Sequence, residues 1–194
     1  MNSILRKSIL GIAGLTVAGG LAAGPLNHDT APTARDTAVS TTQAAKLDTA
    51  TLIPHGVQGT QSHIDLNDEQ TANVKAIIAA TKKAGMDERA AVVSIATALQ
   101  ESKLENLGHL GDRNDHDSQG LFQQRPSSGW GTVEQITDPE YSTTAFLKGL
   151  KQVDGWQDMP LTVAAQTVQV SAYPDHYAQW EQQAADLVAQ HWNK

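Results

Sequence analysis

The segment from Glu88 to Ser102, which reads ERAAVVSIATALQES, constrains the fold more than any other part of the chain. Nearly every position from Ala90 to Leu99 is apolar, whereas a helix at the surface carries apolar residues on one face only. A helix of this composition is buried all round. Asp87, directly before it, belongs to the residue types that cap helix N-termini. We therefore expect a buried helix that begins after Asp87.

Four other segments have the periodicity of amphipathic helices, with apolar residues that recur every three or four positions. The first begins after a capping residue, Asn67 or Asp68, and ends at Gly85, a residue typical of helix C-termini. The others cover Thr143–Val153, Leu161–Ala172 and Tyr177–Trp192. No β-hairpin pattern of comparable strength is present in the sequence. We therefore predict an all-α domain, α+β at most, over residues 67–194, which is long enough to bury its own core.

The first 24 residues, MNSILRKSILGIAGLTVAGGLAAG, have the layout of a secretory signal peptide. Arg6 and Lys7 precede an apolar stretch that runs to about Ala23 and contains small residues at which a signal peptidase can cut. The alternative is a membrane anchor, but the apolar stretch of about 16 residues is shorter than the ~20 residues that span a bilayer. We predict that residues 1–24 are removed on export and that the secreted protein has no stable membrane insertion.

Residues 25–66 are rich in Thr, Ala and polar residues and show neither helical nor strand periodicity. Such a composition buries too little apolar surface to offset the conformational entropy that is lost on folding. We therefore predict that residues 25–66 form a disordered linker and that the folded domain begins at Asn67.

The chain carries 14 basic and 21 acidic residues, which gives a formal net charge of −7, and it contains no cysteine. Nucleic acids and anionic lipids bind basic surfaces, so the acidic balance argues against both as partners. An exported protein without cysteine has neither disulfides nor a lipid-modified cysteine, so its fold depends on its core alone. We expect a secreted monomer that is extracellular or associated with the cell wall.

Glu101 lies near the C-terminal end of the buried helix, two residues after Leu99. Poor hydration disfavours a charged carboxylate and raises the pKa of such a group, and the partial negative charge of a helix C-terminus acts in the same direction. A raised carboxyl pKa is what a general acid needs at neutral pH. From its position alone, Glu101 is either a catalytic acid or a solvated residue where the helix reaches the surface.

Four features that follow one another in order carry a resemblance to a known family. Glu101-Ser102, then Gly120-Leu121-Phe122-Gln123 with Pro126, resembles the Glu-Ser and Gly-Leu-Met-Gln-x-x-Pro signature of soluble lytic transglycosylases and goose-type lysozymes. Downstream, ITDPEYSTTAFLKGL is similar to the Asp-Pro turn and Tyr-Leu helix of that family, and AAQTVQVSAYPDHY stands where the family has an Ala-Tyr-Asn segment. Two features depart from the pattern: Pro174 replaces the Asn, and the segment HLGDRNDHD lengthens the interval between Glu101 and Gly120.

The resemblance implies a lysozyme-like helical domain with a glycan-binding cleft that cleaves the β-1,4 bond between N-acetylmuramic acid and N-acetylglucosamine in peptidoglycan glycan strands. It implies that Glu101 protonates the glycosidic oxygen and then acts as base while the 6-hydroxyl group of the substrate attacks the anomeric carbon. This lytic transglycosylase chemistry needs one protein carboxylate and no cofactor. A muramidase-type hydrolase usually needs a second carboxylate. The candidates for that second carboxylate are Asp112, Asp115 and Asp117.

The residues that we predict to bind substrate surround the same motifs. Hydroxyl groups can donate within a cleft, glutamine amides suit sugar hydroxyl and N-acetyl groups, and a glycine lets its backbone approach a sugar closely. The predicted set is Ser102, Ser118, Gln119, Gly120, Gln123, Gln124 and Tyr173. Tyr173 is expected to orient Glu101 or the sugar. Trp130 and Trp156 lie in loops next to glycines, where an indole either stacks on a sugar or, as is commoner, packs in the core.

Two function classes other than glycan cleavage stay open at this point. A non-catalytic cell-wall binding protein that kept the fold is favoured by Pro174, because the family Asn is lost. A metal-binding protein is suggested by Asp115–Gly120, which imitates the start of a calcium loop. However, the twelfth position of that loop is Pro126 rather than Glu, and His109 and His116 form no close pair. We therefore predict no metal site.

Overall fold

The computed structural model describes residues 47–111, 114 and 116–194. Its α-helices are α1 (Thr49–Leu52), α2 (Asp68–Lys83), α3 (Glu88–Ser102), α4 (Val133–Ile136), α5 (Pro139–Leu150), α6 (Leu161–Gln169) and α7 (Glu181–His191). Short 3-10 helices cover Pro126–Ser128 (η2), Trp156–Asp158 (η3) and His176–Trp180 (η4). Within the described ranges the backbone forms no strand, only an isolated antiparallel bridge between Gln119 and Gln124. The all-α prediction is confirmed.

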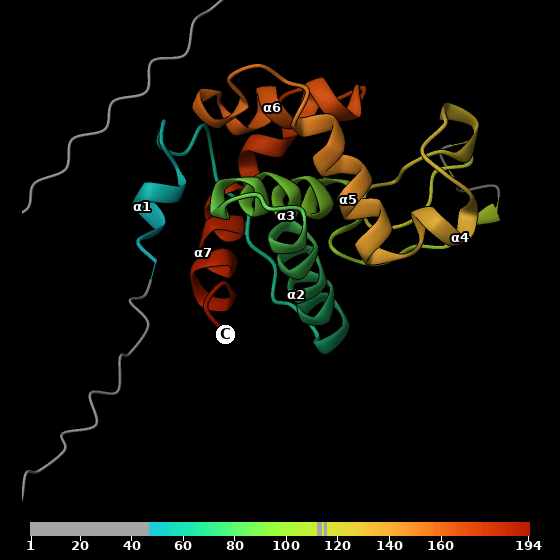
Figure 1. Ribbon diagram of the computed structural model, residues 1–194, viewed down its shortest axis with the longest axis horizontal. Helices are drawn as coiled ribbons and strands as arrows, with labels where there is room; N and C mark the ends of the chain where they lie inside the picture. The colour runs from blue at the N-terminus through green and yellow to red at the C-terminus, as the bar shows by residue number, and fades with distance from the viewer. Residues whose placement is uncertain (1–46, 112–113, 115) are drawn as a thin grey trace, which may run out of the picture. The chain divides into compact units, whose positions relative to one another are not determined.

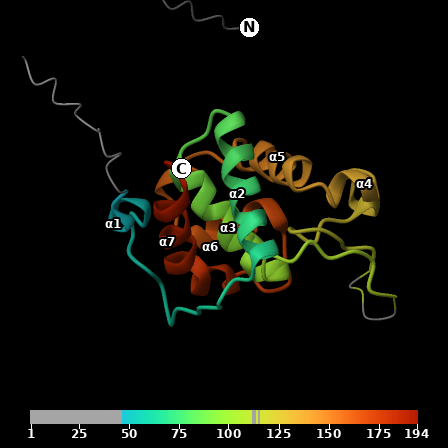
Figure 2. The same cartoon turned by 90° about the horizontal axis from the view of Figure 1, so that it is seen from below.

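Helix α3 lies in the interior, as its sequence predicts. Every residue from Arg89 to Leu99 is buried, and α2, α5, α6, α7 and η4 all pack against α3. In both views α3 lies in the middle of the domain, with α2, α5, α6 and α7 around it (Figures 1 and 2). Beyond Leu99, Gln100 and Glu101 in the last turn of α3 are partly exposed, so Glu101 lies where the buried helix reaches the surface.

The predicted caps of α2 and α3 are confirmed. Asn67 and Gln70 form a capping box, with reciprocal side-chain to backbone hydrogen bonds of 2.8 and 2.9 Å, and Asp87 accepts from the backbone N–H of Ala90. Helix α5 begins earlier than predicted, because Asp138 caps it and Pro139 occupies its first position, where a missing N–H costs nothing.

The last two predicted helices differ in detail from the structure. Helix α6 ends at Gln169 rather than Ala172, because Val170 adopts a left-handed conformation and the side chain of Gln166 holds both backbone groups of Ser171. The predicted single helix over 177–192 is divided into η4 and α7. Across the part of the chain that the structure covers, no helix is long and apolar enough to cross a membrane.

The predicted disordered linker is wrong for residues 47–66, which pack on the helical domain. Leu52 and Ile53 are buried in the core, and farther along Ile64 exchanges backbone hydrogen bonds with the side chain of Gln183 on α7. Leu47, Ile64 and Leu66 also pack against the core, but these apolar residues are spaced without helical or strand periodicity, so the sequence pattern does not reveal them. The predicted signal peptide, residues 1–24, and the rest of the predicted linker, residues 25–46, lie outside the described residues.

A buried ion pair fastens α1 to the core. The Arg89 guanidinium group on α3 lies 2.7 Å from the Glu181 carboxylate on α7, and the same nitrogen donates to the carbonyl of Leu52 at 2.9 Å. Both charged side chains are almost fully buried. Such a pair is costly to break, because removal of one partner leaves a buried charge without compensation. It therefore ties three parts of the chain together at one point.

Candidate active site

The Gly-Leu-Phe-Gln segment folds as a tight turn against the last turn of α3. Gln119 and Gln124 close the turn with two backbone hydrogen bonds of 3.0 Å. The hydroxyl group of Ser102 donates to the carbonyl of Leu121 at 2.8 Å and also contacts the Ala98 carbonyl one turn back on its own helix. Leu121 and Phe122 are fully buried. The two motifs that the sequence separates are therefore joined in space.

Position 120 requires a glycine, because the backbone of the turn packs directly against the backbone of α4 there. Its φ of 78° lies in the left-handed region, and a Cβ atom at this position would lie 2.1 Å from the carbonyl oxygen of Ile136 on α4. Its N–H donates to the Leu107 carbonyl. The prediction that Gly120 lets the backbone approach a sugar is therefore corrected, because the close approach is to α4.

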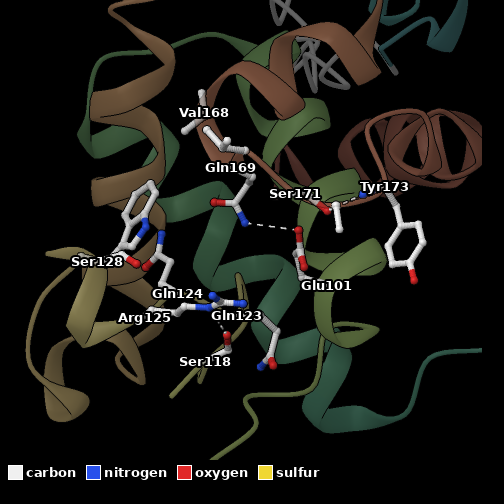
Figure 3. A pocket seen from close by; sticks show the side chains of 13 residues that line it. Glu101, Ser118, Gln123, Gln124, Arg125, Ser128, Val168, Gln169, Ser171 and Tyr173 are labelled. Carbon is white, nitrogen blue, oxygen red and sulfur yellow. Dashed lines mark hydrogen bonds between the residues drawn. The ribbon is translucent and has the colours of Figure 1, made fainter. Parts of the chain in front are cut away.

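A pocket of about 690 Å³ opens beside the last turn of α3. Three parts of the chain form its walls: α3, the turn that continues into η2 and Trp130, and the end of α6 with the loop that follows (Figure 3). The lining residues are Glu101, Ser118, Gln123, Gln124, Arg125, Ser128, Trp130, Val168, Gln169, Val170, Ser171, Ala172 and Tyr173. Among these residues Glu101 carries the one carboxylate, and the remaining polar groups are mainly amides and hydroxyls.

The carboxylate of Glu101 is held by two donors from distant parts of the chain. The Tyr177 hydroxyl group on η4 donates to Oε1 at 2.6 Å. The amide nitrogen of Gln169, at the end of α6, lies 3.4 Å from the same oxygen and donates to the Phe122 carbonyl at 2.8 Å (Figure 3 draws the contact of Gln169 with Glu101). Gln169 thereby connects the carboxylate with the Gly-Leu-Phe-Gln turn.

Tyr177 stays protonated across the physiological range. Burial, together with the negative charge of Glu101 and the hydrogen bond to it, raises the pKa of the Tyr177 phenol far above its ordinary range. A phenol that keeps its proton is a fixed donor, and a short O–H···O bond to a charged acceptor is stronger than a neutral one. Tyr177 therefore orients Glu101 without competing for its proton.

The tyrosine that orients Glu101 is thus not the predicted Tyr173. The side chain of Tyr173 is 62% exposed, lines the pocket, and points away from Glu101 (Figure 3). Sequence reasoning missed Tyr177 although it ends the same AAQTVQVSAYPDHY segment. The two tyrosines stand four positions apart, and it is Tyr177, on η4, whose hydroxyl group reaches Glu101.

Four of the predicted substrate-binding residues line the pocket: Ser118, Gln123, Gln124 and Tyr173. Ser102 and Gln119 do not. The Ser102 hydroxyl group is occupied by backbone carbonyls and Gln119 is 5% exposed within the turn, so both hold the turn in place. On the pocket wall, the Ser118 hydroxyl group accepts from Nε of Arg125 at 2.9 Å.

The predicted second carboxylate is not found at the pocket among the described residues. Asp117 accepts from the backbone N–H and the hydroxyl group of Ser127, both at 2.8 Å. The backbone hydrogen bond from Ser127 is the main reason why the pKa of Asp117 lies below its ordinary value. Asp117 therefore stabilises the start of η2 and is not among the lining residues. Asp112 and Asp115 lie outside the described residues.

The two predicted tryptophans have different environments. Trp156 is 6% exposed and belongs to the core, whereas Trp130 is half-buried and lines the pocket. The whole wall from Val168 to Ala172 was missed by sequence reasoning, because the helical pattern continued through Val170. Where side chains are described, no cluster of His, Asp or Glu has the arrangement of a metal site.

Comparison with known proteins leaves the resemblance as a prediction. No family model matches the chain, and no curated protein matches it in sequence.

Proposed function

We propose that this protein is an exported enzyme that cleaves the β-1,4 bond between N-acetylmuramic acid and N-acetylglucosamine in peptidoglycan, as a lytic transglycosylase. One observation carries the proposal: Glu101 is the one carboxylate among the described lining residues, and buried Tyr177 fixes it at 2.6 Å. A carboxyl group held in a defined orientation at a pocket with amide walls suits acid–base chemistry on a sugar.

The reaction needs only this carboxyl group. Glu101 in its acid form donates its proton to the glycosidic oxygen as the bond from that oxygen to the anomeric carbon breaks. The resulting carboxylate then takes the proton of the muramic acid 6-hydroxyl group, whose oxygen forms the new bond to the anomeric carbon. The products are a 1,6-anhydro end and a free hydroxyl group, and Glu101 returns to its acid form.

The alternative is a muramidase-type hydrolase, in which a second carboxylate activates water or forms a covalent intermediate. Asp117 is a poor candidate for this role, because both of its oxygens accept from Ser127. Among the described residues the transglycosylase is therefore favoured, while Asp112 and Asp115 lie outside them. Product analysis separates the two reactions, since a transglycosylase leaves anhydro-muramyl ends and a hydrolase leaves reducing ends.

The test is cleavage of purified cell walls by the protein and by Glu101→Gln. General acid–base catalysis contributes about 100- to 10,000-fold, so release of soluble muropeptides should fall by that factor. The matched control is Glu105→Gln, which changes an exposed glutamate four residues along and outside the pocket lining and should retain activity. Equal release by wild type and Glu101→Gln would exclude Glu101 as the acid. Binding of glycan strands without release would instead support the non-catalytic class.

A further inference from the structure

Val170 has a backbone conformation that its side chain opposes. Its φ of 52° and ψ of 47° place it in the left-handed region, which disfavours every residue with a Cβ and is a genuine outlier for a β-branched one. Glycine is the usual residue where a helix ends in this way. The Val170 side chain is 79% exposed, so burial in the core does not offset the strain. The hydrogen bonds of Gln166 hold this turn, but they do not require a valine in it, and strained residues of this kind cluster at functional sites.

Tyr173 is a second exposed apolar residue in the same loop. Its ring stacks on the imidazole of His176, with centroids 4.9 Å apart and an interplanar angle of 11°. The side chain is nevertheless 62% exposed, so the stack fixes the ring without covering it. Backbone contacts hold the loop as well: Tyr173 donates to the Ser171 hydroxyl group, and His176 donates to the Tyr173 carbonyl.

Both side chains line the pocket that contains Glu101. In Figure 3, Tyr173 lies on one side of Glu101, and Gln124 and Ser128 lie on the other. The loop from Val170 to Tyr173 cannot shift easily, because the side chain of Gln166 on α6 accepts from the N–H of Ser171 and donates to its carbonyl. The pocket therefore has a rigid, exposed aromatic face at one rim and a wall of amides beyond the carboxylate.

We propose that Val170 and Tyr173 form a saccharide subsite, called here the rim subsite, that binds one N-acetylated pyranose ring of a glycan strand on the Tyr173 side of Glu101. The apolar face of the ring stacks on the tyrosine, and the Val170 methyl groups contact its edge. A rigid aromatic ring loses little entropy on binding and combines apolar contact with a polar hydroxyl tip, which suits a sugar with one apolar face and polar edges. The inference rests on the proposed function for the identity of the ligand.

The test measures binding rather than cleavage, so that its result is independent of catalysis. A β-1,4-linked N-acetylglucosamine oligosaccharide is titrated calorimetrically into Glu101→Gln and into Glu101→Gln with a second substitution. Tyr173→Ala should weaken binding about tenfold, which corresponds to the loss of one aromatic stack, and Tyr173→Phe should keep most of the affinity. Tyr141→Ala, which removes another exposed tyrosine outside the pocket lining, should leave the affinity unchanged.

A second pair of variants separates binding from stability. Val170→Gly relieves the left-handed strain, so the Tm should rise by about 1–3 °C while saccharide affinity falls about threefold. Val163→Gly makes the same change at an exposed valine within α6, where glycine is unfavourable, so the Tm should fall and the affinity should not change.

The outcomes distinguish failure of this inference from failure of the proposed function. Equal affinity of the Tyr173→Ala and parent proteins, or no oligosaccharide binding by either, would overturn the rim subsite. Loss of affinity with Tyr173→Ala would support it even if the wild-type protein released no muropeptides from cell walls, a result that would count against the proposed function alone.

Discussion

Tyr177 links the core to the pocket, because its ring is fully buried while its hydroxyl group reaches Glu101. Tyr177→Phe keeps the buried ring and removes only this donor. A hydrogen bond to a charged group contributes about 1.5–3 kcal/mol, so kcat should fall about 10- to 100-fold. The KM should change little, since Tyr177 is not among the lining residues. Steady-state kinetics on soluble glycan strands measures both constants, and an unchanged kcat would show that Glu101 needs no orientation by Tyr177.

The same phenol predicts how stability depends on pH. The folded state raises the pKa of Tyr177 above its ordinary value of 10.0, so the folded chain holds this proton more tightly than the unfolded chain does. The associated stability is fully present below about pH 10 and is lost as the pH rises further, at ~1.4 kcal/mol per pH unit. Urea unfolding at about pH 9 and about pH 11 should therefore show a steeper decline for wild type than for Tyr177→Phe. Equal declines would contradict a raised Tyr177 pKa.

The turn from Ser118 to Pro126 depends on Gly120 for its contact with α4. Gly120→Ala would add a Cβ atom 2.1 Å from the Ile136 carbonyl oxygen at a φ of 78°. We expect a loss of about 2–4 kcal/mol in the free energy of unfolding, from the left-handed backbone and the forced displacement of α4. Gly129→Ala is the matched control, because its φ is 83° but no atom lies within 4 Å of the added Cβ.

Thermal or urea unfolding compares these two variants. Gly129→Ala should cost only about 1–2 kcal/mol, the backbone part of the effect. Similar costs for the two variants would mean that the turn moves away from α4 without penalty. Loss of activity in Gly120→Ala alone would show that the contact with α4 also sets the position of Gln123 and Gln124.

The helices with strong local signals were predictable from the sequence. Asn67 and Asp87 mark the starts of α2 and α3 through capping groups within three residues of the helix start, and the apolar run of α3 leaves no option but burial. The place of Glu101 at the partly exposed end of that helix follows as well, but its catalytic role stays a prediction that rests on the resemblance, because its position alone also fits a solvated residue. Periodicity could not locate the end of α6, because Val170 fits an apolar helical position and only its backbone conformation excludes it from the helix.

The missed parts of the candidate site depend on contacts between distant segments. Tyr173 and Tyr177 are equivalent in residue type, and only the η4 turn decides that Tyr177 faces Glu101. Asp117 is of the residue type expected for a second catalytic carboxylate. Its carboxylate nevertheless accepts two hydrogen bonds from Ser127 and so stabilises the start of η2. Such assignments need the three-dimensional arrangement, because the partner lies ten or more residues away and no local pattern identifies it.

The segment that precedes α2 belongs to the folded domain and also contacts the elements behind the candidate site. Gln61 and Ser62 bond to Ala178 and Gln179 on η4, the element that carries Tyr177. The Gln179 amide in turn donates to Gln100, the neighbour of Glu101. The packing of the N-terminal segment and the position of the carboxylate are therefore connected through η4, across more than a hundred residues of sequence.

Substitutions in the full chain test whether the N-terminal segment contributes to stability. Leu52 is 5% exposed and Val57 is 43% exposed, and both precede the folded domain as the sequence alone defines it. If the segment packs as the structure describes, Leu52→Ala should lower the free energy of unfolding by about 2–4 kcal/mol through the lost burial and the cavity. Val57→Ala should change it by no more than about 0.5 kcal/mol. A disordered linker would make both changes neutral in urea unfolding, because neither side chain would then be removed from water in the folded state.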